Sequence, residues 1–263
     1  MEQLDHLDSQ DITEQQRSDL INEVVSPHLR ETLGDSVSHN HVRDGYKGLT
    51  FDPTSPDVIE YFEAVPPEAK FQTNFDLAAE VEMLTKANYL SKKDVHQTFP
   101  ARADVRIDTN GEPRFTVRFE GLKYNPIEEP PFETDKGPAD GTIFSVIQLT
   151  KTHSAVPLHP NYRAQTGFNV YYRDSGKVDT YECQVLPERL PQTDLHLQHF
   201  FWTYFEQERI QFVKLSRDFR ILVHSNTVDQ HIAHLKSVFF KLDELQYPFT
   251  FSQSSFFVPS VEW

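Results

Sequence analysis

The sequence contains very little cysteine and glycine. Cys183 is the only cysteine among 263 residues, so the chain forms no internal disulfide and no multi-cysteine zinc site. A lone thiol fits a reducing compartment. Only nine glycines are present, and none builds a phosphate-cradling loop or a dinucleotide-binding fingerprint. These absences exclude a disulfide scaffold and argue against nucleotide enzymes of the common kinds.

Long hydrophobic runs are also missing. No stretch approaches the roughly 18 apolar residues that a membrane helix needs. A secretory signal has a basic region followed by an apolar run. The first six residues, Met1-Glu2-Gln3-Leu4-Asp5-His6, have neither. We therefore expect a soluble, cytoplasmic protein that does not bind membranes.

Positive charge is in short supply. The chain has 25 basic and 40 acidic residues, for a net charge of −15, which argues against nucleic acid as a partner. The deficit is uneven, because residues 1–64 carry 14 acidic and 4 basic side chains, whereas residues 142–263 carry 12 and 11. The acidic third is interpreted as a solvated face with a loose tail, an interaction surface being the alternative.

Apolar residues suffice for a core, since they make up 38% of the chain and aromatic residues 13%. Residues 1–11 read as a polar tail and residues 12–100 as a mostly helical region, with the longest helix at about 74–90. From residue 101 the pattern changes to the alternation of strands, and residues 101–263 are expected to form one continuous domain with residues 12–100.

The second region is expected to be a largely antiparallel sheet with two packed helices. A hairpin is predicted around the turn at 108–111, and residues 125–141 form a proline-rich acidic loop. The remaining expected elements are strands at about 142–150, 168–172, 177–185, 209–215 and 219–224, helices at about 193–207 and 228–245, and a strand after Pro248. The predicted class is α+β, with a helical N-terminal third.

Two histidine pairs lie at helical spacing on the two predicted helices of this region. His196 and His199, and His231 and His234, are each three residues apart, so they face the same side of a helix. Four histidines could ligate zinc, which makes a metallohydrolase one hypothesis. With 12 histidines in the chain such pairs also arise by chance, and we expect no metal.

Several segments, read in order, together resemble the HopA-type effector family, whose relatives include the phosphoserine/phosphothreonine lyase components of class V lanthipeptide and thioamitide biosynthesis. The resemblance spans about residues 46–257 and departs from the family at Asp179-Thr180-Tyr181-Glu182-Cys183, where the family has an Arg-x-Tyr-x-Asn-like strand. The matching segments are Leu84–Asn88, Asn110-Gly111 with Gly121-Leu122, Tyr162–Val170, Ile210–Leu215, Arg220–Val223 and Pro248-Phe249-Thr250.

The resemblance implies a lyase that eliminates phosphate from a phosphorylated peptide to give a dehydroamino acid. Such an enzyme needs a base that is neutral near pH 7, and Lys214, followed by two arginines, is the candidate. His153, in a Lys-x-His pair, is the candidate general acid. The leaving phosphate needs forked cationic donors. The candidates for that role are Arg217, Arg220, Arg163, Arg173 and Lys151.

This hypothesis needs no metal and no organic cofactor. Its implied partners are a phosphorylated precursor peptide and a separate kinase. The main alternative is a non-catalytic member of the same fold that binds a peptide or a protein, either as an effector or as an accessory subunit. The two differ in whether the lysine, the histidine and the arginines meet in one cleft.

Overall fold

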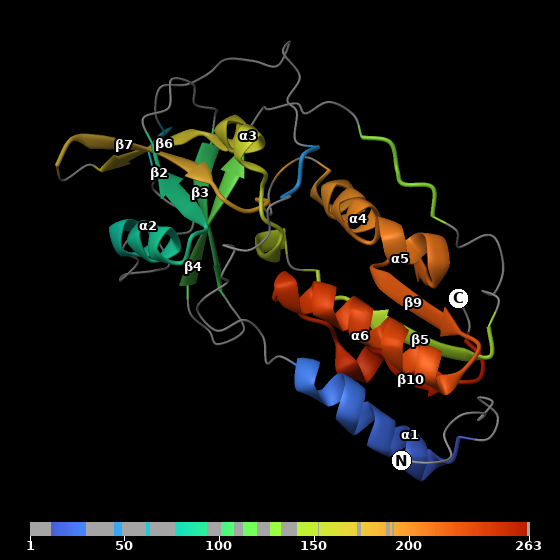
Figure 1. Cartoon of the computed structure of the whole chain (residues 1–263). Coiled ribbons are helices and arrows are strands. Elements are labelled where there is room, and N and C mark those ends of the chain that lie inside the picture. Colours follow the sequence, from blue (N-terminus) through green and yellow to red (C-terminus); the bar gives the residue numbers. More distant parts are fainter. Residues whose placement is uncertain are drawn as a thin grey trace. The chain divides into compact units, whose positions relative to one another are not determined.

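The computed structural model describes residues 12–29, 45–48, 62–63, 77–93, 101–107, 113–119, 127–132, 141–151, 153–172, 175–187, 190 and 192–261. They form α-helices and mainly antiparallel strands, so the predicted α+β class is confirmed (Figure 1). The chain divides into two compact units, each built from segments distant in sequence. Unit 1 comprises Met1–Gly34, Glu129–Thr152 and Gln198–Trp263, and unit 2 comprises Asp35–Glu128 and His153–Leu197.

Unit 1 is built on a four-stranded antiparallel sheet of order β10-β5-β9-β8. Its central strand β5 is almost entirely buried, as its continuous apolar run requires. The four strands are β5 (Ile143–Gln148), β8 (Val213–Leu215), β9 (Arg220–Ser225) and β10 (Ser255–Val258).

Helix α6 (Val228–Glu244) packs on this sheet. Thr227 caps its N-terminus by accepting a hydrogen bond from the Gln230 backbone N–H. The helix ends in a Schellman motif, because the Gln246 N–H donates to the Asp243 carbonyl and the Tyr247 N–H donates to the Leu242 carbonyl. Its buried stripe recurs at helical spacing and consists of Val228, His231, Leu235, Val238, Phe239 and Leu242.

The other helices of unit 1 come from both ends of the sequence. Helix α4 (Thr193–Tyr204) starts within the residues of unit 2 and is followed by α5 (Glu206–Gln211). Near the N-terminus, α1 (Glu14–Leu20), the π-helical turn η2 (Ile21–Val25) and the 3₁₀ turn η3 (Ser26–His28) follow one another. His28 joins this segment to α6, since its Nδ1 lies 2.6 Å from an Asp243 carboxylate oxygen and its ring stacks on Phe239.

Unit 2 contains a second sheet, of order β1-β6-β7-β2, in which only the β1–β6 pair is parallel. A separate antiparallel hairpin, β3–β4, belongs to the same unit. The described elements are β1 (Phe62–Glu63), α2 (Leu77–Lys86), β2 (Leu90–Lys92), β3 (Ala101–Ile107), β4 (Pro113–Phe119), η7 (His153–Ala155), α3 (Pro160–Arg163), η8 (Ala164–Thr166), β6 (Phe168–Tyr172) and β7 (Lys177–Cys183).

The helical N-terminal third is only partly confirmed. Helices α1 and α2 lie where the pattern predicted helix, but β1 and β2 are strands. Ser91 lies in the region that was expected to be mostly helical, but it pairs with Glu182 of β7. The predicted boundary near residue 100 falls inside unit 2.

The predicted strand at 209–215 is correct only from Val213. Before it, α5 continues the helical bonding, because the Arg209 N–H donates to the Phe205 carbonyl at 2.8 Å. The Arg209 guanidinium also lies 3.5 Å from the centre of the Trp202 ring, a contact that holds the two helices together. Within the described ranges, no helix has the length and apolar character needed to span a membrane.

Candidate functional site

The candidate site in unit 1 lies where β5 ends beside the tight connection between β8 and β9. Gln148, the last residue of β5, is directly opposite Arg220, the first residue of β9. Lys214 of β8 is opposite Leu222, which makes it a diagonal neighbour of Arg220 on the same face of the sheet. The register therefore brings one predicted catalytic residue beside one predicted phosphate ligand.

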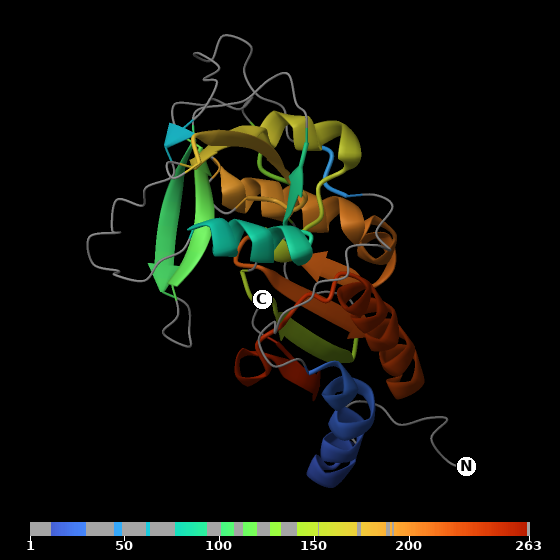
Figure 2. The ribbon, with the colours of Figure 1, turned by 90° about the vertical axis from the view of Figure 1, so that its left-hand side faces the viewer.

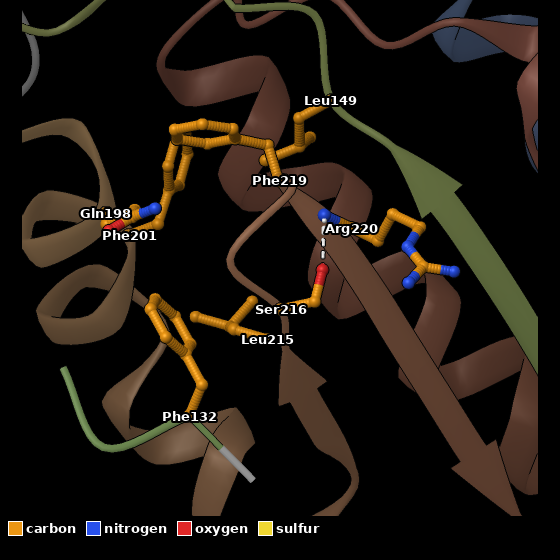
Figure 3. Close-up of a pocket in the computed structure, with 8 residues that line it drawn as sticks. All are labelled: Phe132, Leu149, Gln198, Phe201, Leu215, Ser216, Phe219 and Arg220. Atoms are coloured by element: carbon orange, nitrogen blue, oxygen red, sulfur yellow. Dashed lines mark hydrogen bonds between the residues drawn. The ribbon is translucent and has the colours of Figure 1, made fainter. Parts of the chain in front are cut away.

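The turn that joins the two strands is held by Ser216. Its hydroxyl donates a hydrogen bond to the Asp218 carboxylate and accepts one from the Arg220 backbone N–H at 3.1 Å (Figure 3). Phe219 adopts a φ of 63°, a left-handed conformation that is strained for an aromatic residue. The Leu149 N–H fixes it by donating to the Phe219 carbonyl at 2.9 Å. Strain of this kind persists where the surroundings over-determine the backbone, and it concentrates at functional positions.

A small hollow of about 10 Å³, with room for about one water molecule, adjoins this turn (Figure 3). Gln198 of α4 reaches the turn, and its side-chain amide donates to the Arg217 carbonyl at 2.9 Å. The volume lies below the roughly 300–1,000 Å³ of ordinary ligand pockets. No carboxylate is in the lining, which consists of Phe132, Leu149, Gln198, Phe201, Leu215, Ser216, Phe219 and Arg220.

The two arginines at this turn are paired with nearby carboxylates. Arg217 Nε lies 2.5 Å from a Glu129 carboxylate oxygen, and Arg220 Nε lies 2.8 Å from Asp218. Burial alone would raise the pKa of Asp218, but the Ser216 hydrogen bond and the Arg220 guanidinium outweigh it and lower that pKa. Lys151 Nζ lies 4.9 Å from the centre of the Phe219 ring. The site thus combines two ion-paired arginines with a mostly apolar hollow.

The other predicted site residues lie elsewhere. His153, in unit 2, has Nε2 3.4 Å from an Asp194 carboxylate oxygen. Arg163, also in unit 2, donates from Nε to the Leu158 carbonyl at 3.0 Å and from Nη1 to the Gln184 side-chain oxygen. Arg173 lies outside the described residues. Unit 1 therefore gathers Lys151, Lys214, Arg217 and Arg220 around one turn, while His153 and Arg163 belong to the other unit.

The four histidines of the zinc hypothesis do not form a ligand cluster. Among the residues that the structure describes, no group of three or more His, Cys, Asp or Glu side chains is arranged to hold a metal ion. His196 instead lies with Nδ1 2.6 Å from the buried Tyr46 hydroxyl. His231 and His234 both contact the Ser225 hydroxyl, at 2.9 and 2.8 Å. The hypothesis of a four-histidine zinc site is wrong.

The histidines of α6 belong to a buried polar network that the sequence analysis did not find. His231 Nε2 lies 2.7 Å from the Ser145 hydroxyl, which also accepts a hydrogen bond from the Phe257 N–H at 3.1 Å. Burial, and then the nearby His234 and His224, lower the pKa of His231 to about 3. The sequence feature that could have indicated this network is Ser145, a hydroxyl in the middle of an otherwise apolar buried strand.

Comparison with known proteins yields a likeness of fold only. No protein-family model matches the sequence, and no curated protein matches it significantly. Native prototype foamy virus protease-reverse transcriptase is similar over 96% of this chain and 32% of its own, with a TM-score of 0.59 and 15% identity. The foamy viral protease-reverse transcriptase in complex with an RNA/DNA hybrid is similar over 96% and 33%, with a TM-score of 0.58 and 13% identity. This chain thus spans about a third of the length of these proteins.

Proposed function

We propose that this chain is a non-catalytic protein with a polymerase-like fold, and that it acts by binding another protein. The fold likeness to foamy virus protease-reverse transcriptase over nearly the whole chain supports the polymerase-like fold. The observation that carries the proposal is the pairing of Gln148 with Arg220 beside the strained turn, because neither residue supplies a carboxylate.

Nucleotide transfer by a polymerase depends on carboxylates that hold metal ions. Polymerases use two ions about 3.5–4 Å apart, and Mg²⁺ is held through carboxylates and substrate phosphates. At this turn the Asp218 carboxylate is already engaged by Arg220 and Ser216. A guanidinium at this position repels a divalent cation. Among the described residues, this turn therefore offers no carboxylate that is free to hold a metal ion.

The adjoining hollow argues in the same direction. At about 10 Å³ it is too small for a nucleotide, and its walls are mostly apolar. Large apolar side chains are exposed on two helices of the same unit, with Ile210 of α5 74% exposed and Phe240 of α6 63% exposed. If they belong to one contiguous patch, such side chains are typical of a protein-binding surface.

The test is Mn²⁺ binding, measured by electron paramagnetic resonance. The wild-type turn is expected to bind no Mn²⁺. The variant Gln148→Asp/Arg220→Asp, which places two carboxylates directly opposite each other, is expected to bind it, and Gln148→Asn/Arg220→Asn is the matched uncharged control. Binding by the wild type that is lost in Asp218→Asn would overturn the proposal.

A second candidate is the phosphoserine/phosphothreonine lyase implied by the family resemblance. The observation that favours it is the diagonal placement of Lys214 beside Arg220 on one face of the sheet. Arginines bind a departing phosphate through forked hydrogen bonds, and Lys214 is the residue proposed as the base. This candidate also requires a general acid, and His153, the residue selected for that role from the sequence, belongs to unit 2 rather than to the unit of Lys214.

Mass spectrometry separates the two candidates. A phosphothreonine peptide is incubated with the protein, alone and with a kinase extract, and the loss of phosphoric acid is followed. The lyase candidate requires a loss that disappears in Lys214→Ala and persists in Lys236→Ala, a matched change of an exposed lysine on α6. Equal behaviour of the wild type and Lys214→Ala removes the lyase and leaves the binding role.

A further inference from the structure

A short segment of unit 1, residues 129–132, lies against α4 and the β8–β9 turn, and we call it the strap. It is drawn as a green coil beside α4 (Figure 1). Its Glu129 carboxylate lies 2.5 Å from Arg217 Nε. Its Phe132 ring meets the Trp202 ring edge-on, with 5.5 Å between the ring centres. The strap therefore contacts the rest of the unit through an acid and an aromatic ring.

The backbone of the strap forms a turn of its own. Among the described residues, the only backbone hydrogen bond of residues 129–132 runs from the Phe132 N–H to the Pro130 carbonyl, at 2.7 Å. This bond closes a γ-turn around Pro131, whose ring fixes φ close to the value of about −75° that an inverse γ-turn needs. Pro130 is buried, whereas Pro131 is exposed. The strap is thus a preformed turn that its side chains hold against the unit.

The surface under the strap comes from α4 and the β8–β9 hairpin, which lie next to each other (Figure 2). Phe132 of the strap forms one wall of the small hollow at this place (Figure 3). Other walls are buried side chains of α4 and of the hairpin, each at most 4% exposed: Phe201, Leu215 and Phe219. If the strap moved away, the hollow would open into an apolar pocket that could receive another aromatic ring.

The contacts of the strap are of a kind that can be exchanged. The Arg217 and Glu129 side chains are 64% and 41% exposed, and an ion pair exposed to this degree contributes little to stability. Phe132 is half-buried, with its edge against Trp202. A second segment that carries the same groups could therefore replace the strap at little cost in free energy.

The chemistry of the surface indicates what such a segment contains. Aromatic-lined grooves bind proline-rich segments, because prolines restrict the free segment and so reduce the entropy lost on binding. An arginine beside the groove adds charge-assisted hydrogen bonds to a carboxylate. The strap supplies a partner for each feature, since Glu129 pairs with Arg217 and Phe132 packs on Trp202, with two prolines between them.

We propose that this surface binds a segment of a partner protein that has the chemistry of the strap, namely an acidic residue, two prolines and an aromatic residue in that order. Residues 129–132 occupy the surface until the partner's segment displaces them. The inference rests on the proposed protein-binding role and names the chemistry of the partner. The strap identifies the ligand, because it is a segment of known sequence seated on the surface.

Fluorescence anisotropy on the full chain tests the proposal. The probe is a labelled peptide with the sequence of residues 127–132, Ile-Glu-Glu-Pro-Pro-Phe, and control peptides replace its phenylalanine by alanine or its second glutamate by glutamine. The wild type is expected to bind the probe weakly, because its own strap competes from within the molecule. Phe132→Ala removes the competing ring and is expected to bind at least about tenfold tighter.

Further variants locate the site. Phe251→Ala truncates an exposed phenylalanine elsewhere in unit 1 and should bind like the wild type. Glu129→Arg places a like charge against Arg217, which releases the strap without touching the core, so it gives the same comparison if Phe132→Ala does not fold. Adding Arg217→Gln to Phe132→Ala should remove the preference for the glutamate peptide over the glutamine peptide.

Three results would overturn the inference: no binding of the probe by either strap variant, equal binding by the wild type and both strap variants, or equal binding of the alanine peptide. Tighter binding of a single-stranded oligonucleotide than of the probe by Phe132→Ala would also overturn it, in favour of a nucleic-acid surface. None of these results depends on Mn²⁺ binding at the Gln148–Arg220 turn, so failure here is distinguishable from failure of the proposed function.

Discussion

His231 and Ser145 are hydrogen-bonded inside unit 1, with Nε2 and the hydroxyl oxygen 2.7 Å apart. The other ring nitrogen of His231 lies 2.9 Å from the Ser225 hydroxyl, so β5, β9 and α6 share one buried polar connection. His231 is fully buried and stays neutral because desolvation lowers its pKa to about 3. The connection therefore depends on an uncharged ring.

Acid is expected to destabilise the protein through this histidine. The pKa of a histidine in the unfolded chain is about 6.5, so below that pH the unfolded state binds a proton that the folded state excludes. The unfolding free energy should fall as the pH is lowered from about 6.5 towards 3, by about 2 kcal/mol between pH 6.5 and pH 5. Urea denaturation at a series of pH values measures this change.

The variant His231→Gln keeps hydrogen-bonding capacity without a titratable ring. It is expected to be less stable than the wild type at neutral pH. It should lose less stability on acidification, because it lacks the imidazole ring that binds a proton only in the unfolded chain. Gln230→Ala, at an exposed position on the same helix, changes no titratable group and is the control, which should keep the wild-type slope. An unchanged slope in His231→Gln would assign the acid sensitivity to other groups.

Lys241 and Glu208 form a largely buried ion pair between α6 and α5, with 2.8 Å between Nζ and Oε2. Lys241 also donates to the Tyr204 carbonyl at 2.6 Å. Lys241→Ala leaves the Glu208 carboxylate buried without its cation, and we expect a loss of about 3–5 kcal/mol in unfolding free energy. The exposed Lys236→Ala on the same helix should cost less than about 0.5 kcal/mol.

The double variant Glu208→Leu/Lys241→Leu distinguishes the cost of an unpaired charge from the value of the pair. Replacing both partners by apolar residues is often neutral, so we expect this variant to recover most of the loss seen in Lys241→Ala. Chemical denaturation of the three variants gives the comparison. A double variant as unstable as the single one would mean that the pair itself supplies the stability.

Local patterns predicted the elements whose contacts are local. The alternation in β3 and β4 around a turn predicted the hairpin, and the apolar stripe of α6 predicted the long helix. The strand expected at residues 209–211 was wrong because the Phe205–Arg209 hydrogen bond and the contact between Arg209 and Trp202 continue the helix there. Both strand and helix suit a short apolar stretch, and tertiary contacts decide between them.

Relationships between distant residues were not predictable in the same way. The parallel pairing of Phe62 with Val170 joins segments more than a hundred residues apart, and no periodic pattern in the sequence indicates such a pairing. Lys214 and the following arginines were selected because they are close in sequence, and the β8–β9 hairpin does bring Lys214 beside Arg220. His153 and Arg163 were selected by resemblance, and they belong to a different unit from that turn.

Primer extension tests the central claim most directly. The purified full chain is incubated with a primed RNA or DNA template, nucleoside triphosphates and Mg²⁺ or Mn²⁺, with an active reverse transcriptase as the positive control. Because Arg220 and Ser216 engage the Asp218 carboxylate and Gln148 supplies none, the account predicts no extended primer, even at a protein concentration equal to that of the template. Template-dependent extension by the wild type that disappears in Asp218→Asn would contradict it.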